Sequence, residues 1–244
     1  MKPPPKKTSK TKPSKTRTSL SGRGVPRQSS TEMAYQEIRR QILENEMPAG
    51  FQITEQDLAA RLNVSRTPAR EALLRLEGEG LVEIWPRHGM KVKRVSIDDV
   101  REIYEILTAL ETMAAGLAAI RRPSAKHLDA MRESIKAMDG ALKKDNLKEW
   151  ALADEKFHRL LTEASGNSRF VQIVDTYFGQ SHRLRMMTLG LRPKPTKSNR
   201  DHEAVVKAIA KGDAEEAQRI HRDHRVRSAQ MMIELLTRHG LSHL

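Results

Sequence analysis

The sequence predicts a mainly α-helical protein in which an N-terminal winged helix-turn-helix is followed by a C-terminal all-α bundle of six helices. Two observations carry this prediction. Apolar residues recur at helical spacing over most of the chain. Short apolar runs around a glycine-containing turn occur between residues 81 and 95, which is typical of a single β-hairpin. We therefore divide the 244 residues into a tail (1–30), a head (31–95) and a bundle (96–244).

The composition excludes several classes of protein. Hydrophobic residues make up 38% of the chain and charged residues 31%. There is no cysteine, which excludes a disulfide scaffold, a cysteine nucleophile and a thiolate zinc site. No apolar run approaches the ~18 residues of a membrane span, and the N-terminus lacks the apolar segment of a secretory signal. We expect no membrane contact and a cytoplasmic location.

The tail holds most of the excess positive charge. Nine Lys and Arg residues and no acid occur in residues 1–30, while the net charge of the whole chain is +13. Five prolines and few apolar residues predict that this segment is disordered. A basic arm of this kind raises non-specific affinity for nucleic acid. Two plainer interpretations stay open: a solvated leader without a role, or a start upstream of the true one, because Met33 opens the first periodic segment.

The first half of the head is predicted to form two helices. The first has the apolar stripe Tyr35, Ile38 and Ile42, and it ends at the breaker Met-Pro-Ala-Gly of residues 47–50. The second starts at Thr54, with Asp57 three residues later as a weak capping box. Asn63 ends it, because asparagine tolerates a left-handed backbone.

A third helix and a hairpin complete the head. Ser65 or Thr67 caps the third helix, and Pro68 lies in its first turn, where the missing N–H costs nothing. Residues 81–84 and 90–95 are the two predicted strands. Three short helices followed by a hairpin form a winged helix-turn-helix, whose third helix enters the major groove of DNA.

The side chains expected to contact double-stranded DNA lie at the start of the third helix. Arg66, Thr67 and Arg70 face away from its apolar side, and the two arginines share one face. Each guanidinium can bind the O6/N7 edge of a guanine. Exposed arginines are also common without such a role, and Arg70 could pair with an acid. The basic wing that follows favours DNA binding: Arg87, His88, Lys91, Lys93 and Arg94.

Six helices joined by short loops are predicted after residue 95. Ser96 and Asp99 form a capping box at the first, while Gly166, Pro193 and Pro195 mark later ends. The predicted ranges are 96–122, 124–144, 146–165, 168–191, 198–210 and 214–239. Their Leu and Met stripes are interpreted as core rather than as cofactor contacts.

Four side chains of the bundle form a candidate metal site. Asp154 and His158 are four residues apart, so both project from one face of a helix. His202 lies in the first turn of the fifth bundle helix and His224 midway along the sixth. If these helices converge, one carboxylate and three imidazoles suit a divalent ion such as Zn, Ni, Mn or Fe. From spacing alone, a surface pair and unrelated histidines are the more ordinary interpretation.

The head resembles a known family. Its motif DLAARLNVSRTPAREAL (residues 57–73), with RLE (75–77) and EGLV (79–82), resembles the signature of the GntR family of bacterial transcription regulators. In that family the three positions named at the start of the third helix face the major groove, and the wing tip, here His88 and Gly89, reaches the minor groove. Gln56 stands where the fatty-acid-responsive member has a DNA-contacting arginine. The resemblance therefore implies the fold more securely than the operator sequence.

Residues 98–239 resemble the FCD ligand-binding domain of the FadR subgroup. The segments that carry the resemblance are 104–105, 110–111, 117–119, 154–158, 164–167 and 202–213. In metal-binding members an Asp-x-x-x-His pair, a later His and a last His twenty-two residues beyond hold the ion. The implied ligands here are Asp154, His158, His202 and His224. His221 would be a pocket group or an exposed one.

One position departs from this resemblance. Leu107 stands where the family usually has an arginine that helps to hold an effector carboxylate. Arg101, Arg183 or Arg185 could substitute for it. We expect a small-molecule effector such as an organic acid, while a larger effector, a less anionic one, or none stays open.

Together these features predict a ligand-responsive transcription regulator, not an enzyme, that binds a palindromic operator as a homodimer. A dimer is expected because one winged helix reads too few bases and two-fold symmetry matches a palindrome. The resemblance implies repression of metabolic genes more often than activation. Two other functions are weighed: a non-specific architectural DNA-binding protein driven by the tail, and a metal-dependent hydrolase, for which no general base stands out.

Overall fold

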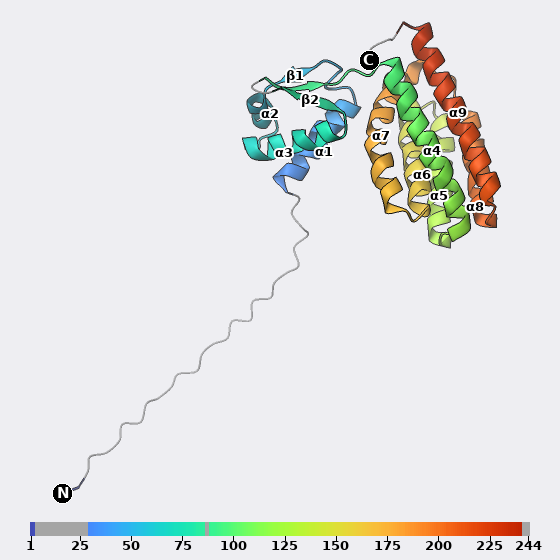
Figure 1. Cartoon of the computed structure of the whole chain (residues 1–244), viewed down its shortest axis with the longest axis horizontal. Coiled ribbons are helices and arrows are strands. Elements are labelled where there is room, and N and C mark those ends of the chain that lie inside the picture. Colours follow the sequence, from blue (N-terminus) through green and yellow to red (C-terminus); the bar gives the residue numbers. More distant parts are fainter. Residues whose placement is uncertain (3–28, 86–87, 241–244) are drawn as a thin grey trace.

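The computed structural model describes residues 1–2, 29–85 and 88–240. Within them, a small head of helices and strands lies beside a bundle of long helices (Figure 1). The predicted fold class, mainly α with a winged helix-turn-helix and an all-α bundle, is confirmed. Most of the tail, and Arg87 of the wing, lie outside the described residues, so the expectations for them stay predictions.

The described part of the head consists of three helices and a three-stranded sheet. The helices are α1 (Ser30–Leu43), α2 (Glu55–Arg61) and α3 (Arg66–Gly78). The strands β1 (Gln52–Ile53), β2 (Val82–Trp85) and β3 (Gly89–Val92) form an antiparallel sheet in the order β1-β3-β2. The pair β2–β3 is the predicted hairpin. The sequence did not predict β1, because two residues are too few to show a periodic pattern.

Local interactions set the turn between α2 and α3. The hydroxyl of Thr54 caps α2 by accepting a hydrogen bond from the backbone N–H of Asp57 at 3.1 Å. Asn63 has a φ of 53°, the left-handed backbone expected after α2. Ser65 precedes α3 with extended backbone but makes no side-chain hydrogen bond to cap it. The helices and the sheet share one buried core, formed by Ile38, Ile42, Leu58, Leu73, Leu76, Met90 and Val92.

Six helices form the described part of the bundle, in the predicted order. They are α4 (Ile97–Arg121), α5 (Ala125–Lys143), α6 (Leu147–Ala164), α7 (Ser168–Met187), α8 (Thr196–Lys211) and α9 (Ala214–Arg238). Two boundaries differ from the sequence prediction by more than one residue. α7 ends at Met187 and a 3-10 turn (Leu189–Leu191) follows it, while α8 begins two residues earlier than expected, directly after Pro195.

α4 is the helix around which the bundle is built. A capping box of Ser96 and Asp99 starts it, as predicted. Among the described residues it is the one helix long and apolar enough to cross a membrane, but half of its most apolar window is buried inside the protein. It packs along α9 and also against α6, α7 and α8. This is the arrangement of a core helix and not of a membrane span.

The head contacts the bundle through α7. The side-chain amide of Gln180 donates a hydrogen bond to the backbone carbonyl of Glu79, just after α3, at 2.8 Å. The buried side chain of Arg183 donates to the backbone carbonyl of Lys93, just after β3, at 2.7 Å. Figure 1 shows α7 on the side of the bundle that faces the head. A shift of α7 would therefore act directly on the head.

Candidate functional site

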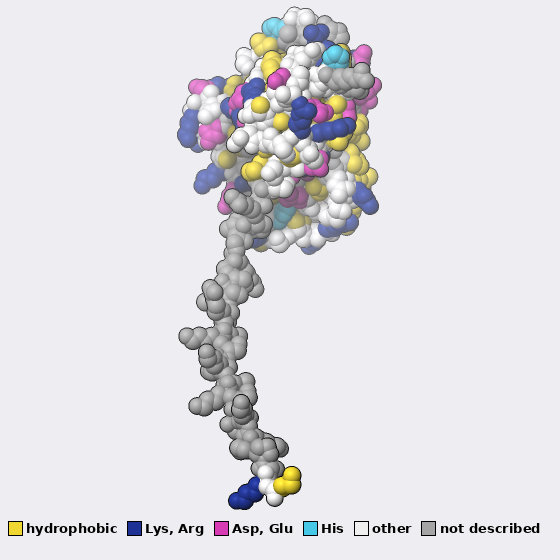
Figure 2. Space-filling view, turned by 90° about the vertical axis from the view of Figure 1, so that its left-hand side faces the viewer, with side chains coloured by type: hydrophobic (Ala, Val, Ile, Leu, Met, Phe, Trp, Pro, Cys, Tyr) yellow, Lys and Arg dark blue, Asp and Glu magenta, His cyan; other side chains and the backbone are white. Residues whose placement is uncertain are grey.

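The side chains predicted to read DNA are exposed at the start of α3. Arg66, Thr67 and Arg70 are all solvent-exposed. Arg66 donates a hydrogen bond to the side-chain oxygen of Gln56, so that position also lies at the expected DNA-binding surface. Arg70 is 4.0 Å from Glu55 in a largely exposed pair, which is too weak to withhold Arg70 from DNA. In Figure 2, a view of the head end, Lys and Arg side chains protrude among acidic ones. Contact with DNA stays a prediction.

At the wing, His88 and Gly89 have different surroundings. His88 is exposed, as a side chain that reaches DNA must be. Gly89 is buried at the start of β3 with a φ of +86°, and a Cβ there would lie 2.1 Å from the carbonyl oxygen of Ile53. Glycine at this position therefore permits the close approach of β1 to β3. The structure adds a packing role to the predicted place of Gly89 at the wing tip.

The four predicted metal ligands come together in the bundle. Asp154 and His158 project from α6, His202 from α8 and His224 from α9. One nitrogen atom from each histidine lies within 4.8 Å of the other two. Asp154 Oδ1 is 3.7 Å from His158 Nε2 and 3.8 Å from His202 Nε2. All four side chains are buried, which excludes the surface-pair interpretation.

Carboxylates lie behind two of the imidazole rings, and one of them is close enough to orient its ring. His158 Nδ1 lies 2.7 Å from Glu111 Oε2 on α4, so its Nε2 faces the cluster. His224 Nδ1 lies 3.6 Å from Asp201 Oδ2 on α8, a looser electrostatic contact than that of His158. A carboxylate behind an imidazole fixes the tautomer and raises the basicity of the other nitrogen, as in many metal sites.

The unpaired nitrogens of His202 indicate that the cluster binds a ligand or a metal ion. The ring is fully buried and stacks on Phe157 with ring centres 4.1 Å apart. Neither of its nitrogens has a hydrogen-bond partner among the described residues. An unpaired buried polar atom is costly, and bonding to a metal ion would remove that cost. Three imidazole nitrogens and one carboxylate oxygen are a donor set that fits Zn, Ni, Mn or Fe. The residues present therefore fit a divalent ion.

Burial keeps the imidazoles in the neutral form that binds metal. Burial, reinforced by His224 and His158, lowers the pKa of His202 well below its usual value. Burial likewise lowers the pKa of His224. For Glu111, burial acts to raise the pKa, but Arg225 and His158 hold it well below the usual range. Glu111 therefore stays a carboxylate and a hydrogen-bond acceptor.

His221, which the sequence left either in the pocket or exposed, is fully buried. Its Nε2 lies 2.9 Å from Glu111 Oε2, the same oxygen that contacts His158. Sequence reasoning missed Glu111, although a signal was present: it is the one charged residue between Ile106 and Ile120. A lone acid in an apolar helix must find buried partners.

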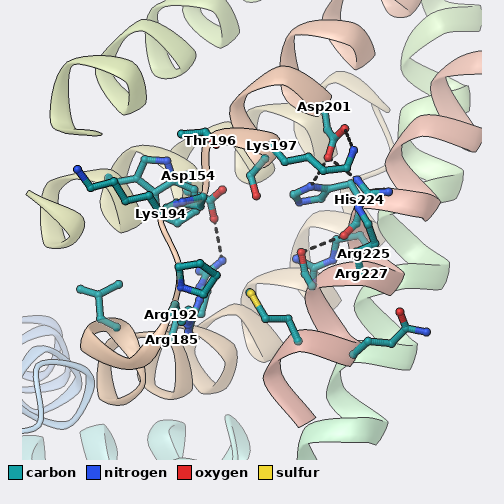
Figure 3. A pocket seen from close by; sticks show the side chains of 18 of the residues that line it. Asp154, Arg185, Arg192, Lys194, Thr196, Lys197, Asp201, His224, Arg225 and Arg227 are labelled. Carbon is teal, nitrogen blue, oxygen red and sulfur yellow. Dashed lines mark hydrogen bonds and ion pairs between the residues drawn. The ribbon is translucent and has the colours of Figure 1, made fainter. Parts of the chain in front are cut away.

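A pocket of about 420 Å³ opens beside the histidines (Figure 3). Asp154, His158 and His224 form part of its wall, so a ligand in the pocket can reach a metal held there. Basic side chains outnumber acidic ones in this wall: Arg185, Arg192, Lys194, Lys197, Arg225 and Arg227 against Asp154, Asp201 and Glu234. This charge balance favours an anionic ligand.

Two buried arginines of the pocket have hydrogen-bonding capacity to spare. Arg185 Nη1 donates to Asp154 Oδ2 at 3.0 Å, and Arg225 Nη2 lies 3.5 Å from Glu111 Oε1. In each guanidinium, Nε and Nη2 have no hydrogen-bond partner within the described part of the chain. Such donors are well suited to a carboxylate, which accepts two parallel hydrogen bonds from one guanidinium.

The positions of these arginines show which of them could take the place of the arginine expected at position 107, where this chain has leucine. Of the three substitutes that the sequence suggested, Arg185 lies in the pocket wall. Arg101 is exposed and pairs with Asp98, and Arg183 binds the head instead. Sequence reasoning did not identify Arg225, because an arginine next to His224 has no local signature that separates it from a surface arginine.

Family models match both parts of the chain. The model described as bacterial regulatory proteins, gntR family, matches residues 30–92, and the FCD domain model matches residues 102–227. The chain belongs to the GntR family. The expected family is confirmed, and the bundle of this GntR regulator is an FCD domain.

Relatives and solved structures agree with this assignment. An uncharacterized HTH-type transcriptional regulator from the TAR-I ttuE-ttuC' intergenic region of Agrobacterium vitis is 41% identical over 146 residues, covering 59% of this chain and 85% of the relative. The HTH-type transcriptional repressor RspR of Escherichia coli K12 is 26% identical, covering 82% of this chain and 87% of the relative. The structure of E. coli McbR/YncC has a TM-score of 0.73 at 18% identity, over 85% of this chain and 99% of that chain, which supports the fold alone. The GntR family consists of transcription regulators, so the chain is not an enzyme and the hydrolase considered above is excluded.

Proposed function

We propose that this GntR-family regulator binds a palindromic operator as a homodimer and responds to a small anionic effector held beside a metal ion. The observation that carries the proposal is the buried cluster of one aspartate and three histidines that opens into a basic pocket. The proposed domains are the tail (1–30), the head (31–95) and the bundle (96–244). The family favours a cytoplasmic location, and the relative RspR, a transcriptional repressor, favours repression.

The effector pocket combines a metal with two guanidinium groups. The ion would be held by Asp154, His158, His202 and His224, and when bound it supplies a Lewis-acidic contact for an effector oxygen. Arg185 and Arg225 approach the same space with unpartnered N–H groups. Together they take the place of the arginine that the family has at position 107, where this chain has leucine. An organic acid is the class of small molecule that satisfies all of these groups.

α7 supplies the route from this pocket to the head. Arg185 lies on the pocket side, bound to Asp154, while Gln180 and Arg183 of the same helix hold the backbone of the head. An effector that recruits Arg185 shifts the preferred position of α7, and the head moves with it. A coupling of ~1–3 kcal/mol changes operator occupancy ~5–150-fold. The chemistry is binding and not turnover.

The outer face of α4 is proposed to bind a second copy of the chain. Met113 and Ile120 on α4 and Val226 on the adjacent α9 are between 41% and 67% exposed. A helix as apolar as α4 is normally covered on all sides. A two-fold contact would present two heads to the two halves of a palindrome. In sedimentation experiments Met113→Lys should dissociate the dimer, whereas Leu152→Lys, at an exposed apolar position on α6, should not.

Operator selectivity tests the proposed function. In a gel shift with a palindrome from the protein's own promoter, the variant with Arg66→Ala and Arg70→Ala should lose preference for the palindrome over a scrambled duplex. Each good guanidinium–guanine contact contributes ~1–3 kcal/mol of discrimination, so the preference should fall by at least tenfold. Arg132→Ala, at an exposed arginine of the bundle, is the matched control. Retained selectivity in the double variant refutes the proposal.

The basic tail keeps a second candidate function open, that of a non-specific architectural DNA-binding protein. Deleting residues 1–30 separates the two. A regulator keeps its operator selectivity and loses only salt-sensitive, non-specific affinity, whereas an architectural protein loses most of its binding.

A further inference from the structure

Arg192 is a basic residue of the pocket wall that contacts neither the predicted metal ligands nor the carboxylates behind them. It follows the 3-10 turn after α7. Its Nε and Nη2 both donate to the hydroxyl of Thr188, at 3.1 and 2.7 Å, and no acidic side chain of the described residues pairs with it. Burial lowers the pKa of Arg192 and repulsion from Arg185 adds to this, while Tyr104 and Asp154 act in the opposite direction. Arg192 is half-buried beside another cation, and no acidic side chain of the described residues touches it, so an anion of a ligand placed against it would be stabilised.

The other basic groups of the pocket already have acidic partners. Lys197 and Arg227 pair with Asp201, Lys194 pairs with Asp145, Arg185 pairs with Asp154, and Arg225 faces Glu111. A single carboxylate on the ligand, placed at the metal, would satisfy the spare donors beside the metal but would leave Arg192 without a counter-charge. A bound divalent ion makes the local positive excess larger still.

The backbone presents Arg192 in a preset position. Arg192 precedes Pro193, and Lys194 precedes Pro195. A residue before proline is confined to extended conformations, and Arg192 has φ −94° and ψ 148°. Its side chain is also tied to Thr188. Little conformational freedom is therefore lost when Arg192 binds a ligand, which favours affinity.

The two sides of the pocket show how a ligand could contact Arg192 and the metal at the same time. Figure 3 shows Arg185 and Arg192 together on one side of the pocket, with Arg225 and Arg227 on the opposite side. Asp154 extends toward Arg185, and His224 lies on the side of Arg225. Asp154 and His224 are both predicted metal ligands, so a ligand that spans the pocket meets Arg225 on one side, the arginine pair on the other, and the metal between them.

We propose that the effector is a compact molecule with two anionic groups, one bound at the metal and Arg225 and the second bound by Arg192 together with Arg185. The inference rests on the proposed effector site and names the class of ligand for it. The second group is a carboxylate or a phosphate, because both accept bidentate hydrogen bonds from a guanidinium. The pocket volume of about 420 Å³ suits a small dicarboxylate or a phosphorylated acid.

Calorimetric titration of the metal-loaded full chain tests the proposal with two matched pairs of probes. Succinate is compared with succinamate, which replaces one carboxylate by an amide, and 3-phosphoglycerate with glycerate. At least one probe with two anionic groups should bind on the order of 10- to 100-fold more tightly than its partner with one, the gain expected for a hydrogen-bonded charge pair. The pair that shows the gain tells whether the second group is a carboxylate or a phosphate.

Arg192→Gln should reduce this gain to less than about twofold while the affinity for the monoanion and the metal content stay unchanged. Arg192→Lys should restore part of the gain, which separates loss of charge from misfolding. Lys194→Gln, which removes a 58% exposed charge from the same pocket, should keep the gain. If monoanions bind but the second anionic group adds nothing, or if Arg192→Gln keeps the gain, the inference is wrong and the proposed function stands. If no member of either pair binds, both fail.

Discussion

Lowering the pH should destabilise the metal-free protein, in large part through His221. Burial lowers the pKa of this imidazole from the ordinary 6.5 to about 4 in the folded chain, even though Glu111 partly opposes the shift. The unfolded chain exposes the ring, so between those two pKa values the unfolded state binds a proton that the folded state does not. The free energy of unfolding therefore falls as the pH drops below 6.5.

The magnitude follows from the two pKa values. Between pH 7 and pH 5 the difference in proton binding at His221 lowers the free energy of unfolding by about 2 kcal/mol. This is a large part of the ~5–15 kcal/mol that stabilises a typical domain. The loss is not complete at pH 5, because the imidazole in the folded chain starts to titrate only near pH 4.

Urea unfolding followed by circular dichroism, in chelator and at both pH values, measures this loss. His221→Gln is the comparison, because its amide can still donate to Glu111 but does not titrate. The two buried ligands His202 and His224 also have lowered pKa values, but they are present in both proteins and cancel in the difference. The variant should lose about 2 kcal/mol less than the wild type over the same pH interval. Equal losses would refute the reasoning.

Three further predictions concern the metal, the wing and the coupling. His224→Ala should lower the metal content of untagged protein, measured by elemental analysis, by about tenfold or more, whereas the exposed His239→Ala should not; unchanged metal content would make the cluster merely structural. Gly89→Ala should destabilise the head by at least ~1–3 kcal/mol in thermal unfolding, because its φ is +86° and the added Cβ meets Ile53, while Gly78→Ala, with open space around it, should not destabilise; equal melting temperatures would contradict this. Arg183→Met should leave effector affinity within about twofold but abolish most of the ~5–150-fold effect of the effector on operator binding. Gln172→Ala, at an exposed position on the same helix, is the control, and an intact response in Arg183→Met would exclude α7 as the route.

Helical periodicity located the elements but not their ends. Capping signals placed the starts of α2 and α4 within a residue, because Thr54 and Ser96 make the hydrogen bonds that their sequence context predicts. The end of α7 was wrong by several residues, since the apolar pattern continues to Leu191 through a 3-10 turn. The strand β1 exists only because β3 pairs with it, so no local pattern announced it.

The sequence predicted the four candidate metal ligands but not the charged side chains around them. The spacing of Asp154 and His158 placed both on one helix face and made His202 and His224 candidates, but the family resemblance was needed to favour a metal site over unrelated histidines. The local sequence around Arg225 and Arg192 does not distinguish them from surface charges, and the apolar stretch around Glu111 indicates that it is buried without showing which residues it contacts. Their role follows from burial, which depends on how the helices pack.

The sequence alone determined the class of the protein: a basic, cysteine-free, two-part chain with a GntR head and a helical FCD bundle, because periodicity and motifs are properties of neighbouring residues. Only the tertiary structure decided which charges are buried together. Side chains from five helices and one connecting segment converge there around a single pocket, and the free energy of a buried charge depends on its neighbours in space rather than in sequence.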